Sequence, residues 1–344
     1  MSDQQRTASS AAATNERLPV ELLVLNKSEV ESLVDERDAT EAALCAFRAV
    51  GENELEQEHF VQNTTKTNII NTMPAYFKSR GLFGMKQVPV YYEREPDDPL
   101  PRIWGSYIVL TDPVNGVPYA LMDGTAITTL RTAGGHAVAA SLHLARKDSS
   151  TLTIIGCGAE SRTAFRSLMN HYALRDVRIF DISKDAMDGF ISEMKGSYTV
   201  PIRPMDSIRA AVEEADLIWT VTSARRSKLL HESWVKPGCF VAGLSGFRDI
   251  DLELSAKADK WVLGTHEGDG HIIDRKAPMF PDGLSKDNVY ADMGEIVKGA
   301  KAGRENDRER IVYTHMGMAG HDVLFAQKAY ERAIEKGVGQ RIVL

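Results

Sequence analysis

The stretch Thr151–Ser161, TLTIIGCGAES, decides the fold of this chain. Its first half is an apolar run of strand type that stops abruptly at Gly156-Cys157-Gly158, and the helical pattern SRTAFRSLMNHYA follows at once. This order is typical of a dinucleotide-binding unit, because glycine lets a phosphate approach the backbone and the helix N-terminus offers free N–H groups. The alternative is an ordinary tight turn, since strand–helix connections often use glycine.

The next apolar strand, VRIFD, favours the first interpretation because it ends in Asp181, roughly 20 residues after the turn. An acid at this place bonds the adenosine ribose hydroxyls of a dinucleotide. It would also repel a 2′-phosphate, and the following Ile182 and Ser183 supply no arginine to bind one, so the sequence favours NAD(H) over NADP(H). The alternative is that Asp181 caps the next helix. Ser161 departs from the fingerprint at the third glycine position.

Outward from this unit, strand and helix patterns alternate through residues 130–313. The alternation predicts an α/β fold with a Rossmann-type, doubly wound parallel sheet. Residues 18–129 mix both patterns and predict a strand-rich α+β region, in which residues 28–51 read as helical with Gly51 as the stop. An amphipathic helix pattern near the C-terminus is expected to pack back on this region. Residues 1–17 are small and polar and predict a disordered tail.

Composition excludes several classes of protein. The 344 residues carry a net charge of −7, with 43% hydrophobic and 26% charged residues, so there is no basic surface for a nucleic acid. No 18 apolar residues run together, so no membrane span is expected. The three cysteines are far apart and show neither metal-ligand nor disulfide spacing, which predicts a reducing compartment, here the cytoplasm, and no metal site.

Outside the glycine turn, a lysine, an arginine and three histidines are candidates for catalysis or substrate binding. Lys86, in FGMKQVPV, is a cation within an apolar strand pattern, where burial would lower its pKa and make it a usable acid or base; the alternative is an edge or surface lysine. Arg131, in TTLRTAGGHA, opens a predicted helix and suits a substrate carboxylate; the alternative is a surface salt bridge. The histidines are candidate proton carriers or structural residues: His136, His315 and His321.

Six motifs occur in order along the chain: MPAYF, GMKQVPV, LMDGTAITTLRTA, TIIGCGAES, WVKPG and HMGMAGHD. Together they resemble the ornithine cyclodeaminase/mu-crystallin family. The resemblance implies a homodimer in which residues 18–129 plus 314–344 form the substrate-binding and dimerisation domain and residues 130–313 bind NAD. It also implies that Lys86 is the active-site lysine and that Arg131 contacts substrate carboxylate and cofactor.

The motif positions and strand ends together define the predicted site. The cofactor positions are Arg131, Thr132, Gly156, Gly158, Ala159, Glu160, Ser161, Asp181, Ile182, Ser183, Thr220, Thr222, Ser223, Ala242 and His315. Lys86 and Arg131 are the predicted catalytic residues. The positions expected to bind substrate are Lys86, Arg131, Lys66, Ser245 and Met316.

Two departures from the resemblance bear on the reaction. The cyclodeaminases carry an aspartate where this chain has Ser245, and a carboxylate-binding arginine before MPAY is missing, with only His59, Gln62 and Lys66 nearby. The later blocks resemble the diaminopropionate-pathway amino-acid dehydrogenases. We therefore expect an NAD(H)-dependent oxidoreductase that moves hydride at the α-carbon of an amino acid or its imine, formed from an oxo acid. The alternatives are a cyclodeaminase that uses NAD without net redox change, and a cofactor-binding crystallin-like protein without turnover.

Overall fold

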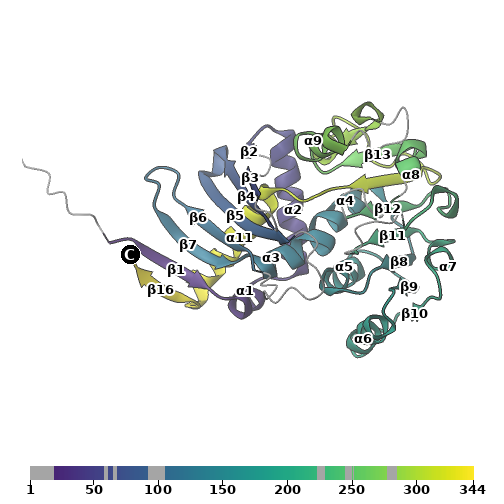
Figure 1. Ribbon diagram of the computed structural model, residues 1–344, viewed down its shortest axis with the longest axis horizontal. Helices are drawn as coiled ribbons and strands as arrows, with labels where there is room; N and C mark the ends of the chain where they lie inside the picture. Colours follow the sequence, from purple (N-terminus) through teal and green to yellow (C-terminus); the bar gives the residue numbers. More distant parts are fainter. Residues whose placement is uncertain are drawn as a thin grey trace, which may run out of the picture.

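The computed structural model describes residues 19–57, 61–64, 68–91, 105–222, 229–244, 250, 252–276 and 285–344. Within these residues the chain forms two eight-stranded sheets, sheet A and sheet B, which lie side by side in Figure 1. None of the described helices is long and apolar enough to cross a membrane.

Sheet B is built from the region around the glycine turn, and all its pairs are parallel. In spatial order its strands are β10 (Ile202–Pro204), β9 (Asp176–Phe180), β8 (Thr151–Ile155), β11 (Leu217–Thr220), β12 (Phe240–Gly243), β15 (Ile311–Thr314), β13 (Lys260–Leu263) and β14 (Ala291–Asp292). The strand order reverses between β8 and β11, which is where ligands bind in such sheets. The predicted α/β fold with a Rossmann-type parallel sheet is therefore confirmed.

Sheet A is antiparallel except for its β1–β7 pair. Its strands, in order, are β16 (Gln340–Val343), β1 (Glu21–Leu25), β7 (Pro118–Asp123), β6 (Tyr107–Thr111), β5 (Leu82–Tyr91), β4 (Asn68–Phe77) and β2 (Leu55–Gln57), with β3 (Val61–Thr64) paired to β4. The long helix α11 (Ala319–Lys336) crosses back from sheet B and packs on β4, β5 and β6. Sheet A thus joins both ends of the described chain.

The remaining helices link or cover the sheets. They are α1 (Lys27–Leu33), α2 (Glu36–Gly51), α3 (Gly124–Arg131), η2 (Thr132–His136), α4 (Ala137–Leu144), α5 (Ala159–Met169), α6 (Lys184–Met194), α7 (Ile208–Val212), α8 (Leu252–Lys257), α9 (His266–Lys276) and α10 (Met293–Lys298), with short 3-10 turns η1 (Lys78–Arg80), η3 (Glu232–Trp234) and η5 (Lys286–Asn288). Alternate side chains of sheet B enter two cores on its opposite faces: Leu217 and Trp219 enter one, and Ile218 the other. A sheet buried on both faces explains the continuous apolar strands in the sequence.

The helical pattern of residues 28–51 forms two helices, α1 and α2, which are separated at Val34 and Asp35. Asp35 starts α2 by accepting the N–H groups of Arg37 and Asp38. Gly51 is the last residue of α2 and has no left-handed conformation. A Cβ at Gly51 would lie 2.3 Å from Gly294 O, so this glycine allows α2 and α10 to approach closely.

Arg131 ends helix α3, so the prediction that it opens a helix is wrong. The helix starts earlier because Asp123 caps it by accepting the N–H of Ala126 at 2.8 Å. A π turn, η2, follows Arg131, and in it the N–H of Ala137 donates to Thr132 O, five residues back. Such turns occur frequently at functional sites.

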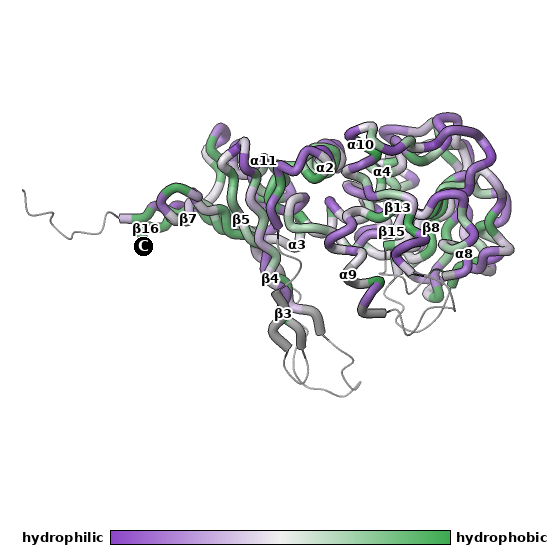
Figure 2. The backbone as a smooth tube through the Cα atoms, turned by 90° about the horizontal axis from the view of Figure 1, so that it is seen from above, coloured by the Kyte–Doolittle hydropathy of each residue, from purple (hydrophilic) through white to green (hydrophobic). Residues whose placement is uncertain are grey.

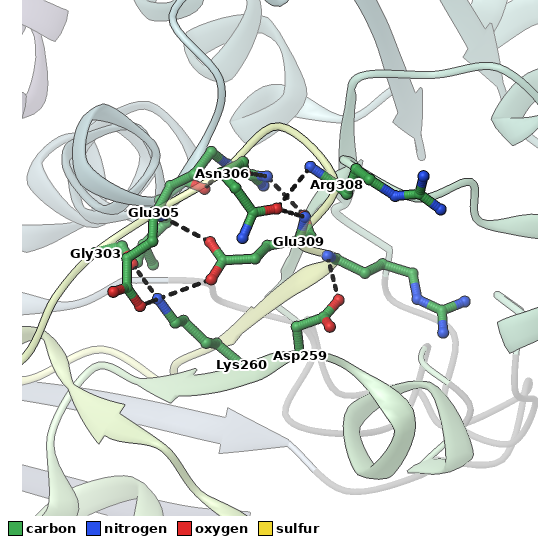
Figure 3. A network of polar contacts seen from close by, with 10 residues as sticks. Asp259, Lys260, Gly303, Glu305, Asn306, Arg308 and Glu309 are labelled. Carbon is green, nitrogen blue, oxygen red and sulfur yellow. Dashed lines mark hydrogen bonds and ion pairs between the residues drawn. The ribbon is translucent and has the colours of Figure 1, made fainter.

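A polar network closes the amino-terminal edge of sheet B, opposite the glycine turn (Figure 3). Lys260, at the start of β13, is 5% exposed and its Nζ lies 2.7 Å from Glu305 and 3.1 Å from Glu309. Asp259 accepts the N–H of Arg310 at 2.7 Å, just before β15 begins. These contacts fix the starts of neighbouring strands and leave the carboxyl edge for ligands.

Candidate active site

The glycine turn connects β8 to α5 at the carboxyl edge of sheet B. Gly156 has a φ of +99°, and a Cβ there would lie 2.3 Å from Val221 O, so the turn requires glycine. Gly158 is the N-cap of α5 and has no capping side chain bond, and a Cβ there would meet no atom within 4 Å. The backbone is therefore open where a phosphate would approach the helix N-terminus.

A cavity of about 690 Å³ lies over this turn, at the switch point between β8 and β11. This volume suits a small-molecule ligand. The predicted cofactor positions that line the cavity are Gly156, Gly158, Ala159, Glu160, Asp181, Ile182 and Thr222. The sequence therefore located residues of one common cavity, although they come from separate strand ends.

Asp181 stands at the end of β9 and faces the glycine turn. Its Oδ2 accepts the N–H of Cys157 at 2.8 Å, and its Oδ1 accepts the N–H of Ser183 at 2.9 Å. Ser183 is the N-cap of α6, with its side chain accepting from Ala186, so the alternative that Asp181 caps this helix is wrong. Ile182, 98% exposed, lines the cavity beside the carboxylate.

Three other predicted cofactor positions are buried: Ser161 on α5, Thr220 on β11 and Ala242 on β12. Ser161, at the third glycine position, is buried and donates its hydroxyl to Gly156 O at 2.6 Å. Thr220 is buried and donates to Ala242 O at 3.4 Å. Ser161, Thr220 and Ala242 are not among the residues that line the cavity, whereas Gly156 is. A small hydroxyl therefore replaces the expected third glycine and braces the turn.

Lys86, Arg131 and Asp322 form a buried ion cluster between sheet A and helix α11. Lys86 Nζ lies 2.7 Å from Asp322 Oδ2, and Arg131 Nε donates to Asp322 Oδ1 at 3.0 Å. The Lys86 and Asp322 side chains are 1% and 0% exposed. Lys86 lies on β5, an inner strand paired with β4 and β6, so the edge or surface alternatives for Lys86 and Arg131 are wrong.

Burial lowers the pKa of Lys86 to about 8, and the positive charge of Arg131 acts in the same direction, while Asp322 opposes both. Glu160, in the cavity wall, interacts electrostatically with both cations. Burial raises the pKa of Glu160, and Arg131 and Lys86 oppose that shift. The ion cluster is thus electrostatically linked to the cavity, and its lysine can gain or lose a proton near neutral pH.

The segment after β15 closes around the arginine. Gly317 has a φ of +86°, and a Cβ there would lie 2.5 Å from an Arg131 Nη atom. Met316 donates its N–H to Asp269 Oδ1 at 2.9 Å, and His315 Nδ1 lies 2.7 Å from Asp269 Oδ2. Both predicted residues are therefore held by one carboxylate, with His315 buried and Met316 half-buried.

Thr132 and Ser183 use their side chains locally. The Thr132 hydroxyl donates to Thr128 O at 2.7 Å, inside the helix that carries Arg131. Three predicted positions, Lys66, Ser223 and Ser245, lie outside the described residues.

Two acids of the site were missed in the sequence. Asp322 was hidden within the C-terminal amphipathic pattern, although an acid between a histidine and an apolar run is an unusual choice for a core-facing position. Asp269 lies in an ordinary polar stretch, and no local signal marks it.

Comparisons with known proteins show which family this chain resembles. A sequence model described as the ornithine cyclodeaminase/mu-crystallin family matches residues 20–337. The alanine dehydrogenase of Archaeoglobus fulgidus is 30% identical, over 94% of this chain and 98% of that protein.

Two solved structures share the fold over nearly the whole chain. The Thermococcus litoralis delta(1)-pyrroline-2-carboxylate reductase, in complex with NADH and L-proline, has a TM-score of 0.84 and 29% identity, covering 93% of this chain and all of that one. An archaeal alanine dehydrogenase dimer with bound NAD has a TM-score of 0.83 and 28% identity, covering 94% of this chain and 99% of that one.

Proposed function

The chain belongs to the ornithine cyclodeaminase/mu-crystallin family, and from this premise we propose that it is an NAD(H)-dependent oxidoreductase acting on an amino acid or its imine. The observation that carries the proposal is the buried cluster of Lys86, Asp322 and Arg131, whose two cations interact electrostatically with Glu160 in the wall of the glycine-turn cavity. Relatives named as an alanine dehydrogenase and a pyrroline-2-carboxylate reductase support the same class of reaction.

The cavity residues fit a dinucleotide. Gly158 leaves open space at the N-terminus of α5 for the pyrophosphate, and Asp181 at the end of β9 offers its carboxylate to the ribose hydroxyls. When bound, the nicotinamide supplies or accepts the hydride. The protein then has to bind the substrate and manage one proton.

Arg131 would hold the substrate carboxylate. Asp322 occupies its Nε, which leaves the two Nη groups to form a bidentate contact. Lys86 would give a proton to the imine nitrogen during reduction and take it back during oxidation, since its pKa of about 8 permits both states. Asp322 keeps the two cations apart and oriented.

An assay of the whole chain tests this function. NADH, ammonia and a panel of 2-oxo acids and cyclic imines, including pyruvate, glyoxylate and pyrroline-2-carboxylate, should give loss of nicotinamide absorbance with at least one substrate. Ammonia release from a diamino acid without net NADH change would show a cyclodeaminase instead. Tight NADH binding without turnover of any substrate would support the crystallin-like alternative.

We also propose a preference for NAD(H) over NADP(H), which rests on Asp181. Its carboxylate would repel a 2′-phosphate, and its neighbour Ile182 is an exposed apolar residue of the cavity rim. Changing Asp181 to alanine should lower the ratio of kcat/KM for NADH to that for NADPH by about tenfold or more, because charge repulsion is removed. Steady-state kinetics with both cofactors measures this ratio.

Asp185 provides the matched control, because it is an exposed acid in the first turn of α6 and does not line the cavity. Asp185→Ala should leave the ratio unchanged. If the Asp181 variant and the wild-type protein had the same ratio of kcat/KM for NADH to that for NADPH, Asp181 would not determine the cofactor preference.

The chain is further proposed to act as a homodimer through sheet A, within a substrate domain of residues 18–129 and 314–344. Helices α3 and α11 pack on one face of the sheet. The other face carries a continuous cross-strand row of Pro74, Met85, Val109 and Leu121, and Figure 2 shows β5 as strongly hydrophobic. A relative with this fold forms a dimer. Light scattering should give twice the chain mass, and a monomer would contradict the proposal.

A further inference from the structure

Three histidine rings meet next to the ion cluster, although the sequence separates them widely. His136 ends η2, His315 follows β15 and His321 lies in the first turn of α11. None is more than 2% exposed. The ring centroids are 4.6 Å apart for His136 and His315, 5.3 Å for His136 and His321, and 5.5 Å for His315 and His321. We call these residues the imidazole cluster.

Two rings of the imidazole cluster have a polar partner at Nδ1. Asp269 accepts backbone N–H groups from Gly264, Thr265 and Met316, so it also accepts from His315 Nδ1 at 2.7 Å. In a neutral His315 ring, Nε2 is then a bare acceptor. Tyr313 OH lies 3.1 Å from His136 Nδ1, and burial raises the pKa of this phenol, which keeps its proton available to donate. If Tyr313 donates in this bond, His136 Nε2 carries the N–H, and if Tyr313 accepts, Nε2 is a bare acceptor.

Several nitrogens of the imidazole cluster have no hydrogen-bond partner among the described residues. Within the described part of the chain, His136 Nε2, His315 Nε2 and both nitrogens of His321 have no hydrogen-bond partner. Each such buried group costs about 1–3 kcal/mol if it stays unsatisfied. Buried polar atoms of this kind are usually explained by a water or an ion.

A cation is excluded by two observations. Among the described residues, no group of three or more histidine, cysteine or acidic side chains could hold a metal ion. Burial lowers the pKa of His136 and His321 well below the usual value, and the positive charges of Arg131 and Lys86 act in the same direction. The rings of His136 and His321 are therefore neutral, and a neutral molecule with both donors and acceptors suits them.

We propose that His136, His315 and His321 enclose one water molecule, and that this hydrated cluster positions the catalytic residues relative to sheet B. Because water both donates and accepts, it would pair with His136 Nε2, His315 Nε2 and a nitrogen of His321, on rings whose centroids are 4.6–5.5 Å apart. The effect of the water on catalysis rests on the proposed oxidoreductase function, whereas its presence does not.

The cluster can position the site because each ring adjoins a residue already described there. His321 directly precedes Asp322, His136 lies one π turn after Arg131, and His315 directly precedes Met316 at the end of β15. A bridge between the rings therefore holds α11 and η2 against the carboxyl edge of sheet B. These histidines are positioning residues, because they touch neither cavity nor ion cluster through a hydrogen bond in the described structure.

A crystal structure of the full chain with NADH tests the water directly. Density for one water within hydrogen-bond distance of all three rings is expected. Rings bonded to one another without a water would overturn the proposal. The crystal structure shows the water whether or not the protein turns over a substrate. A protein without redox activity would therefore contradict the proposed function but not the presence of the water.

Two variants of His321 test the positioning role. His321→Leu keeps the size of the side chain but cannot bind the water, so kcat should fall about tenfold while the KM for NADH is retained. The isotope effect on kcat with NADH deuterated at nicotinamide C4 should rise. His321→Gln, which can still donate and accept, should restore most of kcat. A leucine variant with unchanged kcat and isotope effect would overturn the role, and thermal unfolding checks that both variants fold.

Discussion

Changing Lys86 to alanine should abolish turnover, with a loss of about a thousandfold in kcat/KM, while NADH binding is retained. The loss is large because Lys86 is the proton carrier of the ion cluster. Its other described cation, Arg131, stays protonated near neutral pH and cannot replace it. Retained binding is expected because Lys86 lies on β5 and does not line the cavity over the glycine turn. Stopped-flow single turnover and NADH fluorescence titration measure the two quantities.

Lys78 serves as the control for this variant. It lies on η1 in the same region, and its contact with Glu56 is at the surface. Lys78→Ala should keep full activity. If Lys86→Ala retained more than about a tenth of kcat/KM, Lys86 would lose its catalytic role.

The pKa of about 8 for Lys86 also sets the direction of the pH dependence. Below pH 8 the free protein carries the ammonium form, which is the proton donor for imine reduction, so kcat/KM for reduction should fall as pH rises through 8. Oxidation of the amine needs the neutral lysine, so its kcat/KM should rise over the same range. Profiles that do not diverge around pH 8 would remove Lys86 as the proton carrier.

Changing Asp322 to asparagine should have the second large effect, this time on stability as well as activity. The side chain is 0% exposed and pairs with two buried cations, so removing its charge leaves Lys86 and Arg131 beside each other without compensation. Breaking a buried ion pair in this way costs about 3–5 kcal/mol. Denaturant unfolding measures this free energy.

The same variant should also shift the activity profile. Asp322 raises the pKa of Lys86 against burial, so without it the pKa should fall below 8 and the reduction rate should decline at a lower pH. Glu331→Gln, an exposed change on the same helix, is the matched control. An Asp322 variant with unchanged unfolding free energy and pH profile would show that the ion cluster contributes neither stability nor proton affinity.

The part of the fold around the glycine turn could be predicted because its signals are local. A parallel strand buried on both faces gives a continuous apolar run, and Gly156 and Asp181 follow such runs directly. Strand β4 was missed because Pro74 interrupts its pattern, although this residue pairs across the sheet with Met85. The start of α3 was missed because Asp123 ends a strand and caps a helix at once.

The ion cluster and the imidazole cluster could not be assembled from the sequence. Lys86 and Arg131 were identified singly, but their shared partner Asp322 comes from the far end of the chain. Whether a lone histidine such as His321 is structural or functional depends on what α11 packs against, and no periodicity encodes that contact. Long-range contacts of side chains therefore set the limit of the sequence argument.

The π turn after Arg131 has a consequence for insertions and deletions. Successive residues of an α-helix are rotated by about 100°, so residues five apart point in different directions. In the π turn, the N–H of Ala137 donates to Thr132 O, so residues five apart lie closer to the same side of the helix. The π turn therefore sets the rotation of α3, which carries Arg131, relative to α4. We expect a deletion of Gly135 to convert the π turn to an α turn and to rotate α3 relative to α4 by about 100°, which would disturb the contact of Arg131 with Asp322 although both residues remain in the chain.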